Sequence, residues 1–259
     1  MPRVALITGG ASGIGLATAR LLSSEGGPVV LADRDERAGR QAAEDVGGSF
    51  ARTDVSDLGS VQHAVDAAER EHGRLDLVVL NAGITTGETP IDKLDLEQYR
   101  TIVGVNVDGV VFGVRSALPA LRRSGGGSIV VTASLSGLTP YPQDPIYSMT
   151  KHAVVGLTRS LAQPLKADGV TVNCICPGFV STPLIDAYRE RFTQVGLPLL
   201  DADDVAAAVL AAAGSRESGQ AWVCQPGRPA FRASPDRSGQ MASRLTSTEL
   251  SIRYPDERA

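Results

Sequence analysis

The chain has 259 residues, a formal net charge of −4, 42% hydrophobic residues and 21% charged residues. This length and composition suit one large α/β domain with a buried core, and the acidic balance and 4% aromatic content argue against nucleic-acid binding. The first apolar run, residues 4–7, is too short for a signal segment or a membrane span, so we expect a cytoplasmic protein without membrane contact.

Three cysteines, Cys174, Cys176 and Cys224, form no C-x-x-C pair. We therefore expect small buried thiols and no metal site.

The dinucleotide-binding pattern stands at the start of the chain. Residues 4–7 predict a buried parallel strand, T-G-G-A-S-G-I-G follows at 8–15, and a helical pattern continues from there. Glycines in such a turn let the backbone approach a pyrophosphate at the helix N-terminus. A tight structural turn is the alternative. The predicted cofactor contacts in the turn are Gly9, Ser12, Gly13, Ile14 and Gly15.

A second apolar run, residues 29–32, ends at Asp33. A carboxylate there accepts hydrogen bonds from the adenosine ribose hydroxyls and repels a 2′-phosphate, which favours NAD over NADP. Arg34 and Arg37 can counter this charge, but the glycine turn carries no basic residue. The alternative is that Asp33 caps the helix that starts near Asp35.

Two further strands, 49–52 and 75–80, end at polar or small residues. After the first, a carboxylate at Asp54 can bind the adenine amino group or cap the next helix. After the second, small residues let the chain pass beneath a ligand, and Asn81 can tie neighbouring strands together or serve a purely structural turn. The predicted cofactor contacts here are Asp54, Val55, Asn81, Ala82 and Gly83.

A helical pattern over 94–121 is interrupted at 105–109, where the Asn106 amide is expected to satisfy backbone groups at a kink. The following strand, 128–134, places the Ser134 hydroxyl at its carboxyl end. Open α/β sheets bind ligands at those ends.

Tyr147 and Lys151 lie four residues apart on a helix that opens near Pro145, so both can point into one cleft. A free tyrosine titrates near pH ~10, too high for a base at neutral pH. We expect the Lys151 charge to stabilise the phenolate and lower its pKa. A single pair at this spacing is commonly a solvated helix edge, so the interpretation depends on the rest of the chain.

The pattern of residues in the last third of the sequence predicts a strand at 170–176, a mobile substrate lid at 181–198, an Ala-rich helix to 213 and a strand at 221–224. Residues 228–259 are polar and predict a weakly ordered arm. The alternation of strands and helices predicts an α/β fold: a Rossmann-type doubly wound parallel sheet of about seven strands, in one domain over residues 1–227.

These motifs together resemble the short-chain dehydrogenase/reductase family over about residues 3–227. The matching positions are T-G-x3-G-x-G at 8–15, N-A-G at 81–83, Asn106, Ser134, Y-x3-K at 147–151 and P-G at 177–178. Segments 143–147, 151–152 and 175–180 resemble the NAD-dependent hydroxyprostaglandin dehydrogenase branch.

Three positions depart from the family pattern: Ala133, where a second serine is usual; Leu80, where an asparagine is frequent; and Q-P-G at 225–227, where Asp-Gly-Gly is common. None of the three removes a catalytic group.

The resemblance implies catalytic roles for four residues. Tyr147 would be the acid/base, Ser134 the donor to the substrate oxygen, and Lys151 the group that also binds the nicotinamide ribose. Asn106 would hold a proton-relay water. Further cofactor contacts are implied at Pro177, Gly178, Val180 and Thr182.

The expected function is an NAD(H)-dependent oxidoreductase that interconverts a secondary alcohol and a ketone. An NADPH-dependent carbonyl reductase is one alternative, against which Asp33 argues. A catalytically silent dinucleotide sensor that regulates a partner is the other, against which the intact Ser134, Tyr147 and Lys151 argue.

The predicted substrate contacts are mostly apolar, which indicates a lipid-like, cyclic or aromatic substrate, although core packing accounts for several of them equally well. They are Ser134, Leu135, Leu138, Tyr141, Gln143, Phe179 and Leu184. The helix that carries Tyr147 is apolar on more than one face, which indicates a homo-oligomer, a dimer or a tetramer.

Overall fold

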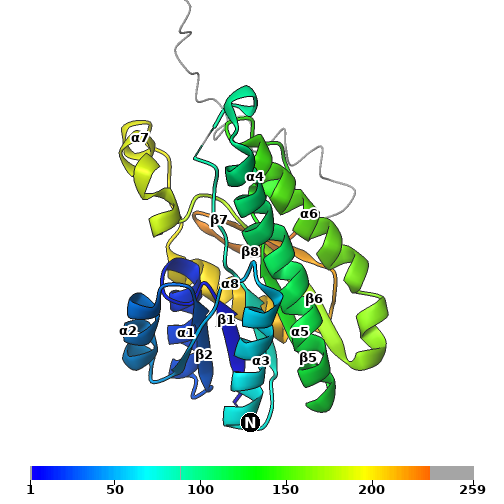
Figure 1. Cartoon of the computed structure of the whole chain (residues 1–259). Coiled ribbons are helices and arrows are strands. Elements are labelled where there is room, and N and C mark those ends of the chain that lie inside the picture. The colour runs from blue at the N-terminus through cyan, green and yellow to red at the C-terminus, as the bar shows by residue number, and fades with distance from the viewer. Residues whose placement is uncertain (1, 88, 234–259) are drawn as a thin grey trace, which may run out of the picture.

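A computed structural model describes residues 2–87 and 89–233 and shows three layers, a sheet with helices on both of its faces (Figure 1). The sheet has eight strands in the order β3-β2-β1-β4-β5-β6-β7-β8. The strands are β1 Ala5–Thr8, β2 Val29–Asp33, β3 Ser49–Arg52, β4 Leu77–Leu80, β5 Gly127–Thr132, β6 Val170–Pro177, β7 Ala221–Gln225 and β8 Arg228–Arg232.

The described helices follow the predicted alternation. They are α1 Gly13–Ser24, α2 Glu36–Val46, α3 Leu58–His72, α4 Leu96–Val103, α5 Gly109–Arg123, α6 Pro145–Leu161, α7 Arg189–Gln194 and α8 Ala202–Gly214. Short 3-10 helices are η1 Ile91–Lys93, η3 Leu135–Gly137, η4 Pro164–Asp168 and η5 Pro183–Tyr188, and a π-helical turn is η2 Gly104–Asp108.

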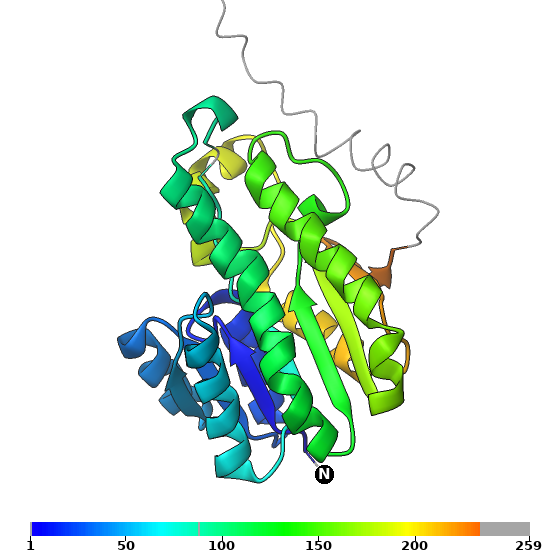
Figure 2. The same ribbon diagram turned by 45° about the vertical axis from the view of Figure 1, so that its right-hand side comes forward.

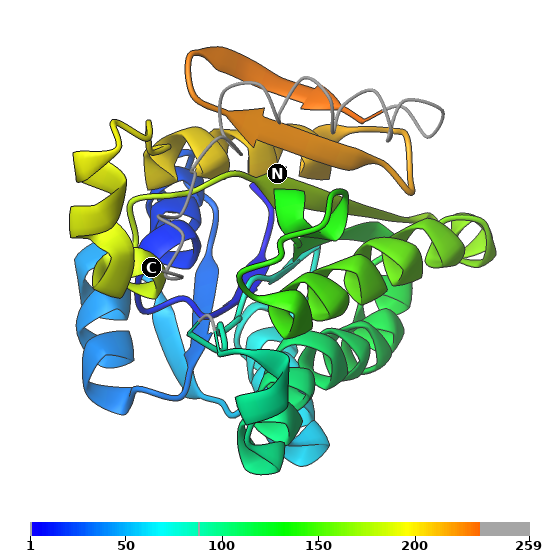
Figure 3. The same ribbon diagram turned by 90° about the horizontal axis from the view of Figure 1, so that it is seen from above.

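Both faces of the sheet are buried. In β1, Ala5 and Ile7 pack into the core on the α1 and α8 side, whereas Leu6 packs into the core on the α3 and α5 side. Figure 3 shows α1, α2 and α8 on one side of the sheet and α3, α5 and α6 on the other. Burial on both faces explains why the parallel strands are continuous apolar runs. The predicted doubly wound fold is confirmed, and all three cysteines are buried free thiols.

The strand order reverses between β1 and β4, because β2 and β3 extend the sheet in one direction and β5, β6 and β7 in the other. Strands β1 to β7 are parallel, so their carboxyl ends meet at one edge of the sheet. A crevice forms at that edge beside the point of reversal, which is where open α/β sheets bind ligands.

The run from Leu96 to Arg123 is a continuous rod of α4, η2 and α5 that lies beside α6 (Figure 2). The predicted interruption at 105–109 is present as the π-helical turn at Gly104–Asp108. By length and composition alone this rod resembles a membrane span, but 44% of its most apolar window is buried inside the domain. It is accordingly placed as a core helix of the fold.

The predicted polar arm from residue 228 is wrong at its start. Arg228–Arg232 form β8, which pairs antiparallel with β7 through Val223↔Phe231 and makes the eighth strand at the sheet edge (Figure 3). Gly227, at φ 75°, provides the left-handed turn that reverses the chain between the two strands. The remainder of the predicted arm, 234–259, lies outside the described residues.

Candidate active site

The glycine turn has the geometry that a bound pyrophosphate needs. Gly9 and Gly13 adopt φ of 64° and 52°, and a Cβ on Gly15 would lie 2.2 Å from the Gly9 carbonyl oxygen. Glycine is therefore required at all three positions. The side chain of Ser12 makes no capping bond to α1, whose first turn carries no acidic residue. The first N–H groups of this helix consequently face the pocket without a side-chain acceptor, which suits an anion.

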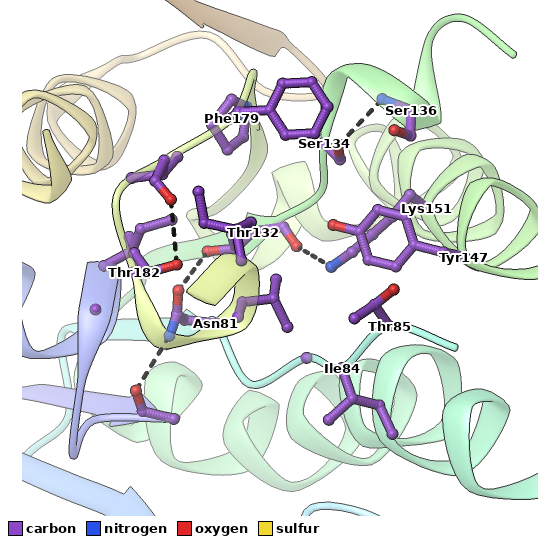
Figure 4. Close-up of a pocket in the computed structure, with 18 of the residues that line it drawn as sticks. Asn81, Ile84, Thr85, Thr132, Ser134, Ser136, Tyr147, Lys151, Phe179 and Thr182 are labelled. Carbon is purple, nitrogen blue, oxygen red and sulfur yellow. Dashed lines mark hydrogen bonds between the residues drawn. The ribbon is translucent and has the colours of Figure 1, made fainter. Parts of the chain in front are cut away.

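Asn81 joins three strand ends (Figure 4). Its Nδ2 donates to the carbonyl oxygens of Thr8 and Gly9 at 3.1 and 3.2 Å, and its Oδ1 accepts from Thr132 Oγ1 at 3.1 Å. The amide therefore ties β1, β4 and β5 at the edge of the crevice. Of the two roles that the sequence allowed, the geometry supports the tie between strands.

Asp33 lies on the pocket wall at the end of β2. Its Oδ2 accepts from the Ala11 N–H at 3.1 Å, and its Oδ1 accepts from the Asp35 N–H at 3.1 Å. Asp35, rather than Asp33, caps α2, because it accepts from the Ala38 N–H. The capping alternative for Asp33 is therefore wrong, and its carboxylate is held between the glycine turn and the start of α2.

Asp54 is likewise not a helix cap. Asp57 caps α3 by accepting from the Ser60 N–H. The Asp54 carboxylate instead accepts from the N–H and hydroxyl of Ser56, and these two hydrogen bonds lower its pKa. Both Asp33 and Asp54 thus stand at the same end of the pocket, next to β2 and β3.

The opposite end of the pocket brings Ser134, Tyr147 and Lys151 together (Figure 4). The Ser134 hydroxyl lies beside the Tyr147 phenol and acts to lower the pKa of that phenol. The Lys151 ammonium donates to the Thr132 carbonyl oxygen at 2.8 Å and lies 5.5 Å from the centroid of the Tyr147 ring. These groups and the glycine turn line one cavity of about 470 Å³. The predicted convergence on a single cleft is therefore present.

Burial controls the protonation of this pair. It raises the pKa of Tyr147 to about 12, outweighing the hydrogen bond from Ser134, which lowers it. It also lowers the pKa of Lys151 to about 8. The expected net lowering of the tyrosine pKa by Lys151 is therefore wrong for the protein by itself, because removing both groups from water disfavours both charged forms.

Asn106 is fully buried and does not lie on the pocket wall. Its Oδ1 accepts from the Ile84 N–H at 2.8 Å, and its Nδ2 donates to the Ile84 carbonyl at 2.9 Å and to Thr150 Oγ1 at 3.1 Å. Both hydrogens of the Asn106 amide are thus donated to other groups of the protein. The side chain holds the loop after β4, and the implied role in binding a water would have to use another group of this residue.

All but two of the other predicted contacts line the cavity. Those on its wall are Gly9, Ser12, Gly13, Ile14, Val55, Ala82, Gly83, Leu135, Tyr141, Gln143, Pro177, Gly178, Phe179, Val180, Thr182 and Leu184. Gly15 lies beneath the turn against Gly9, and Leu138 packs against the hydrophobic core.

The predicted lid is folded into η5 and α7, which pack on the substrate end of the pocket. Phe192 of α7 lies 4.5 Å from Phe179 and 6.1 Å from Tyr188, measured between ring centroids. Tyr188, Arg191 and Phe192 also line the wall of the cavity and were not predicted from the sequence. The four-residue spacing of Tyr188 and Phe192 was the available signal, because it places two aromatic rings on one helical face.

Lys151→Met should change how stability depends on pH. The pKa of Lys151 is about 8 against an ordinary 10.5, so the unfolded chain binds more protons than the folded chain between these values. The free energy of unfolding of the parent protein should therefore rise with pH across this window, by up to ~3 kcal/mol relative to Lys151→Met.

Urea unfolding of both proteins near pH ~7 and pH ~10, without added cofactor, measures this difference. Lys166 is exposed, so Lys166→Met controls for the loss of one positive charge. If the difference in the free energy of unfolding between the parent and Lys151→Met were the same at both pH values, the prediction would be contradicted.

Comparison with known proteins agrees with this geometry. Residues 3–192 match the family model described as short chain dehydrogenase. Borneol dehydrogenase, mitochondrial, from Lavandula x intermedia is 38% identical over 80% of this chain and 82% of its own length. Cyclohexanol dehydrogenase from Acinetobacter sp. (strain SE19) is 35% identical over 73% of this chain and 77% of its own length.

Among solved structures, a 3-ketoacyl-(acyl-carrier-protein) reductase from Brucella melitensis complexed with NADH superimposes with a TM-score of 0.80 and 32% identity, covering 87% of this chain and 98% of that one. The chain therefore belongs to the short-chain dehydrogenase/reductase family, whose members are NAD(P)-dependent oxidoreductases acting on CH–OH groups.

Proposed function

We propose that this protein is an NAD-dependent dehydrogenase that interconverts a bulky secondary alcohol and its ketone, with Tyr147 as the acid/base. The observation that carries this proposal is that Ser134, Tyr147 and Lys151 line the same cavity as the glycine turn. A dinucleotide sensor needs only the turn, so the presence of all three favours an enzyme.

Ser134, Tyr147 and Lys151 have separate roles in the proposed reaction. The Ser134 hydroxyl donates to the alcohol oxygen, and the Tyr147 phenolate takes the hydroxyl proton of the alcohol and becomes the phenol. Lys151, held by the Thr132 carbonyl, supplies the positive charge that stabilises this phenolate before it takes the proton. When bound, the nicotinamide ring accepts the hydride. Lys151 is buried and Tyr147 is partly buried, so the pair is largely screened from bulk water during this proton transfer.

The preference for NAD rests on Asp33. Two backbone N–H groups hold its carboxylate on the pocket wall, where it would repel a 2′-phosphate and accept from ribose hydroxyls. Arg34 also lines this end and is the feature that favours the alternative, an NADPH-dependent carbonyl reductase.

The substrate end of the pocket is apolar and aromatic. Tyr141 stands edge-on to Phe179 at 6.1 Å, and Leu135, Leu184 and Phe192 continue the wall. Such a surface suits a bulky hydrocarbon skeleton with one polar function. The names of the borneol and cyclohexanol dehydrogenases, which denote cyclic secondary alcohols, support the same substrate class here.

Tyr147→Phe tests the catalytic role. The phenylalanine keeps the ring and removes the acid/base, so oxidation of secondary alcohols should fall by roughly 10²-fold or more while NAD binding is largely kept. Turnover is followed by absorbance of the reduced cofactor across a panel of cyclic and linear alcohols. Tyr99→Phe, at the protein surface, is the matched control. Retention of full turnover in Tyr147→Phe would refute the assignment, and a parent protein without turnover would favour the sensor.

Asp33→Ala tests the cofactor preference. Removal of the carboxylate should raise kcat/KM with NADP relative to NAD by about tenfold or more, because the repulsion of the 2′-phosphate is lost. Initial rates with both cofactors measure the ratio. A parent protein that already prefers NADP would show that the role assigned to Asp33 is wrong.

We also propose a homo-oligomer formed through an exposed apolar face of α4, α5 and α6, defined by Leu96, Tyr99, Val111 and Met149. These side chains are between 36% and 64% exposed. Large apolar groups gathered on adjoining helices favour burial against a second copy. Light scattering should show a dimer or tetramer that Met149→Glu weakens and Val195→Glu, outside this face, does not. A monomeric parent protein would exclude the assembly.

A further inference from the structure

Asp144 is a fully buried carboxylate with no role in the chemistry described so far. Its Oδ1 accepts from the Tyr147 N–H at 2.9 Å and from Thr86 Oγ1 at 2.6 Å. Its Oδ2 accepts from Thr85 Oγ1 at 2.6 Å and from the Thr86 N–H at 2.9 Å. All four partners are uncharged donors, which is the pattern that an ionised carboxylate takes.

These donors belong to two separate pieces of the chain. The Tyr147 N–H is in the first turn of α6, of which Asp144 is the N-cap. Thr85 and Thr86 are in the loop that follows β4, and Ile84 and Thr85 of this loop line the cavity on the side of Tyr147 (Figure 4). The carboxylate therefore bridges the catalytic turn and a wall of the pocket.

A second set of hydrogen bonds joins the same two pieces. Asn106 binds both backbone groups of Ile84 and donates to Thr150 Oγ1. Thr150 Oγ1 in turn donates to the Tyr147 carbonyl at 2.7 Å. Because the loop is held on both sides by buried polar groups, a shift of the loop would strain the turn that carries Tyr147.

We propose that Asp144 is a positioning residue that clamps the Tyr147 turn of α6 to the loop at residues 84–86, and so sets the place of the phenol relative to cofactor and alcohol. The kinetic consequences rest on the proposed function; the clamp itself does not. A displacement of about 1 Å at a reacting group can lower turnover by ~10²-fold, so such a clamp matters for kcat more than for cofactor binding.

The charge of Asp144 also reaches the phenol. Burial is the largest cause that raises the pKa of Tyr147; Ser134 lowers it, and the charge of Asp144 and the neighbouring Cys176 of β6 raise it further. Lys151, on the same helix, is the cation over the tyrosine ring. Removal of the Asp144 charge should therefore make the phenolate accessible at lower pH, an effect of the charge that is separate from the loss of the clamp.

Four variants separate the cap from the clamp. Asp144→Ser keeps a good N-cap for the Tyr147 N–H but has one oxygen and cannot hold the loop. Asp144→Asn keeps the shape but turns an NH₂ group against the N–H of either Tyr147 or Thr86. Thr86→Val removes one donor to the carboxylate, and Thr86→Ser retains it as the matched control.

In Asp144→Ser, kcat for alcohol oxidation should fall about tenfold or more with little change in NAD affinity, and the rising limb of kcat against pH should move to lower pH. In Asp144→Asn the rising limb of kcat against pH should move to lower pH in the same way. Thr86→Val should lower kcat less, and Thr86→Ser should resemble the parent. The double variant Asp144→Ser/Thr86→Val should lose no more than Asp144→Ser alone, since both remove one contact.

Hydrogen exchange of the protein without cofactor provides the readout that needs no turnover. Asp144→Ser should speed exchange at the Thr86 amide and leave the Tyr147 amide nearly unchanged. If the parent protein oxidises no alcohol, the proposed function fails while this measurement still tests the clamp. An unchanged exchange rate at the Thr86 amide would overturn the proposal. So would an unmoved rising limb of kcat against pH together with additive losses of kcat in the double variant.

Discussion

The site depends on a short chain of hydrogen bonds through Asn81. Its Nδ2 donates to the Gly9 carbonyl, its Oδ1 accepts from the Thr132 hydroxyl, and the Thr132 carbonyl accepts from the Lys151 ammonium. The glycine turn and the catalytic helix are thus joined through the ends of β4 and β5. This link explains how groups from distant parts of the chain share one cavity in a fixed arrangement.

Burial changes both the strength of the interaction between Tyr147 and Lys151 and the stability of their charged forms. Lys151 is buried and Tyr147 is partly buried, which strengthens the interaction between them but disfavours both charged forms. Specific neighbours offset this cost: the Ser134 hydroxyl lowers the pKa of the phenol, and the Thr132 carbonyl accepts from the ammonium. A buried polar network of this kind is useful only when nearly every member is satisfied.

Two departures from the family pattern, Leu80 and Ala133, are buried apolar side chains, and Ala133 also lines the cavity. Leu80 packs so close to Gly113 of α5 that a Cβ there would lie 2.3 Å from the leucine Cδ2. An apolar side chain at the end of β4 is therefore accommodated by a glycine on the covering helix. Ala133 is buried, 2% exposed, directly before Ser134. The donor that the reaction needs is consequently unaffected by either change.

The fold class, the glycine turn and the candidate residues Ser134, Tyr147 and Lys151 could be predicted from the sequence alone. These follow from local spacing and from the rule that the carboxyl ends of parallel strands meet at one edge. Strand β8 was missed because a short polar run becomes a strand only by pairing with β7. Its existence depends on a neighbour, which local periodicity does not show.

Only the tertiary structure decided the balance of charges and the role of Asp144. The direction of the Tyr147 pKa depends on how completely the ring is removed from water, which no spacing of residues reveals. The Asp-Pro pair at 144–145 did mark a helix start. The hydrogen-bond partners of the Asp144 carboxylate, Thr85 and Thr86, however, lie 59 and 58 residues away in the sequence. Contacts over that separation exist because the sheet and its helices pack together, so sequence patterns alone could not predict the clamp.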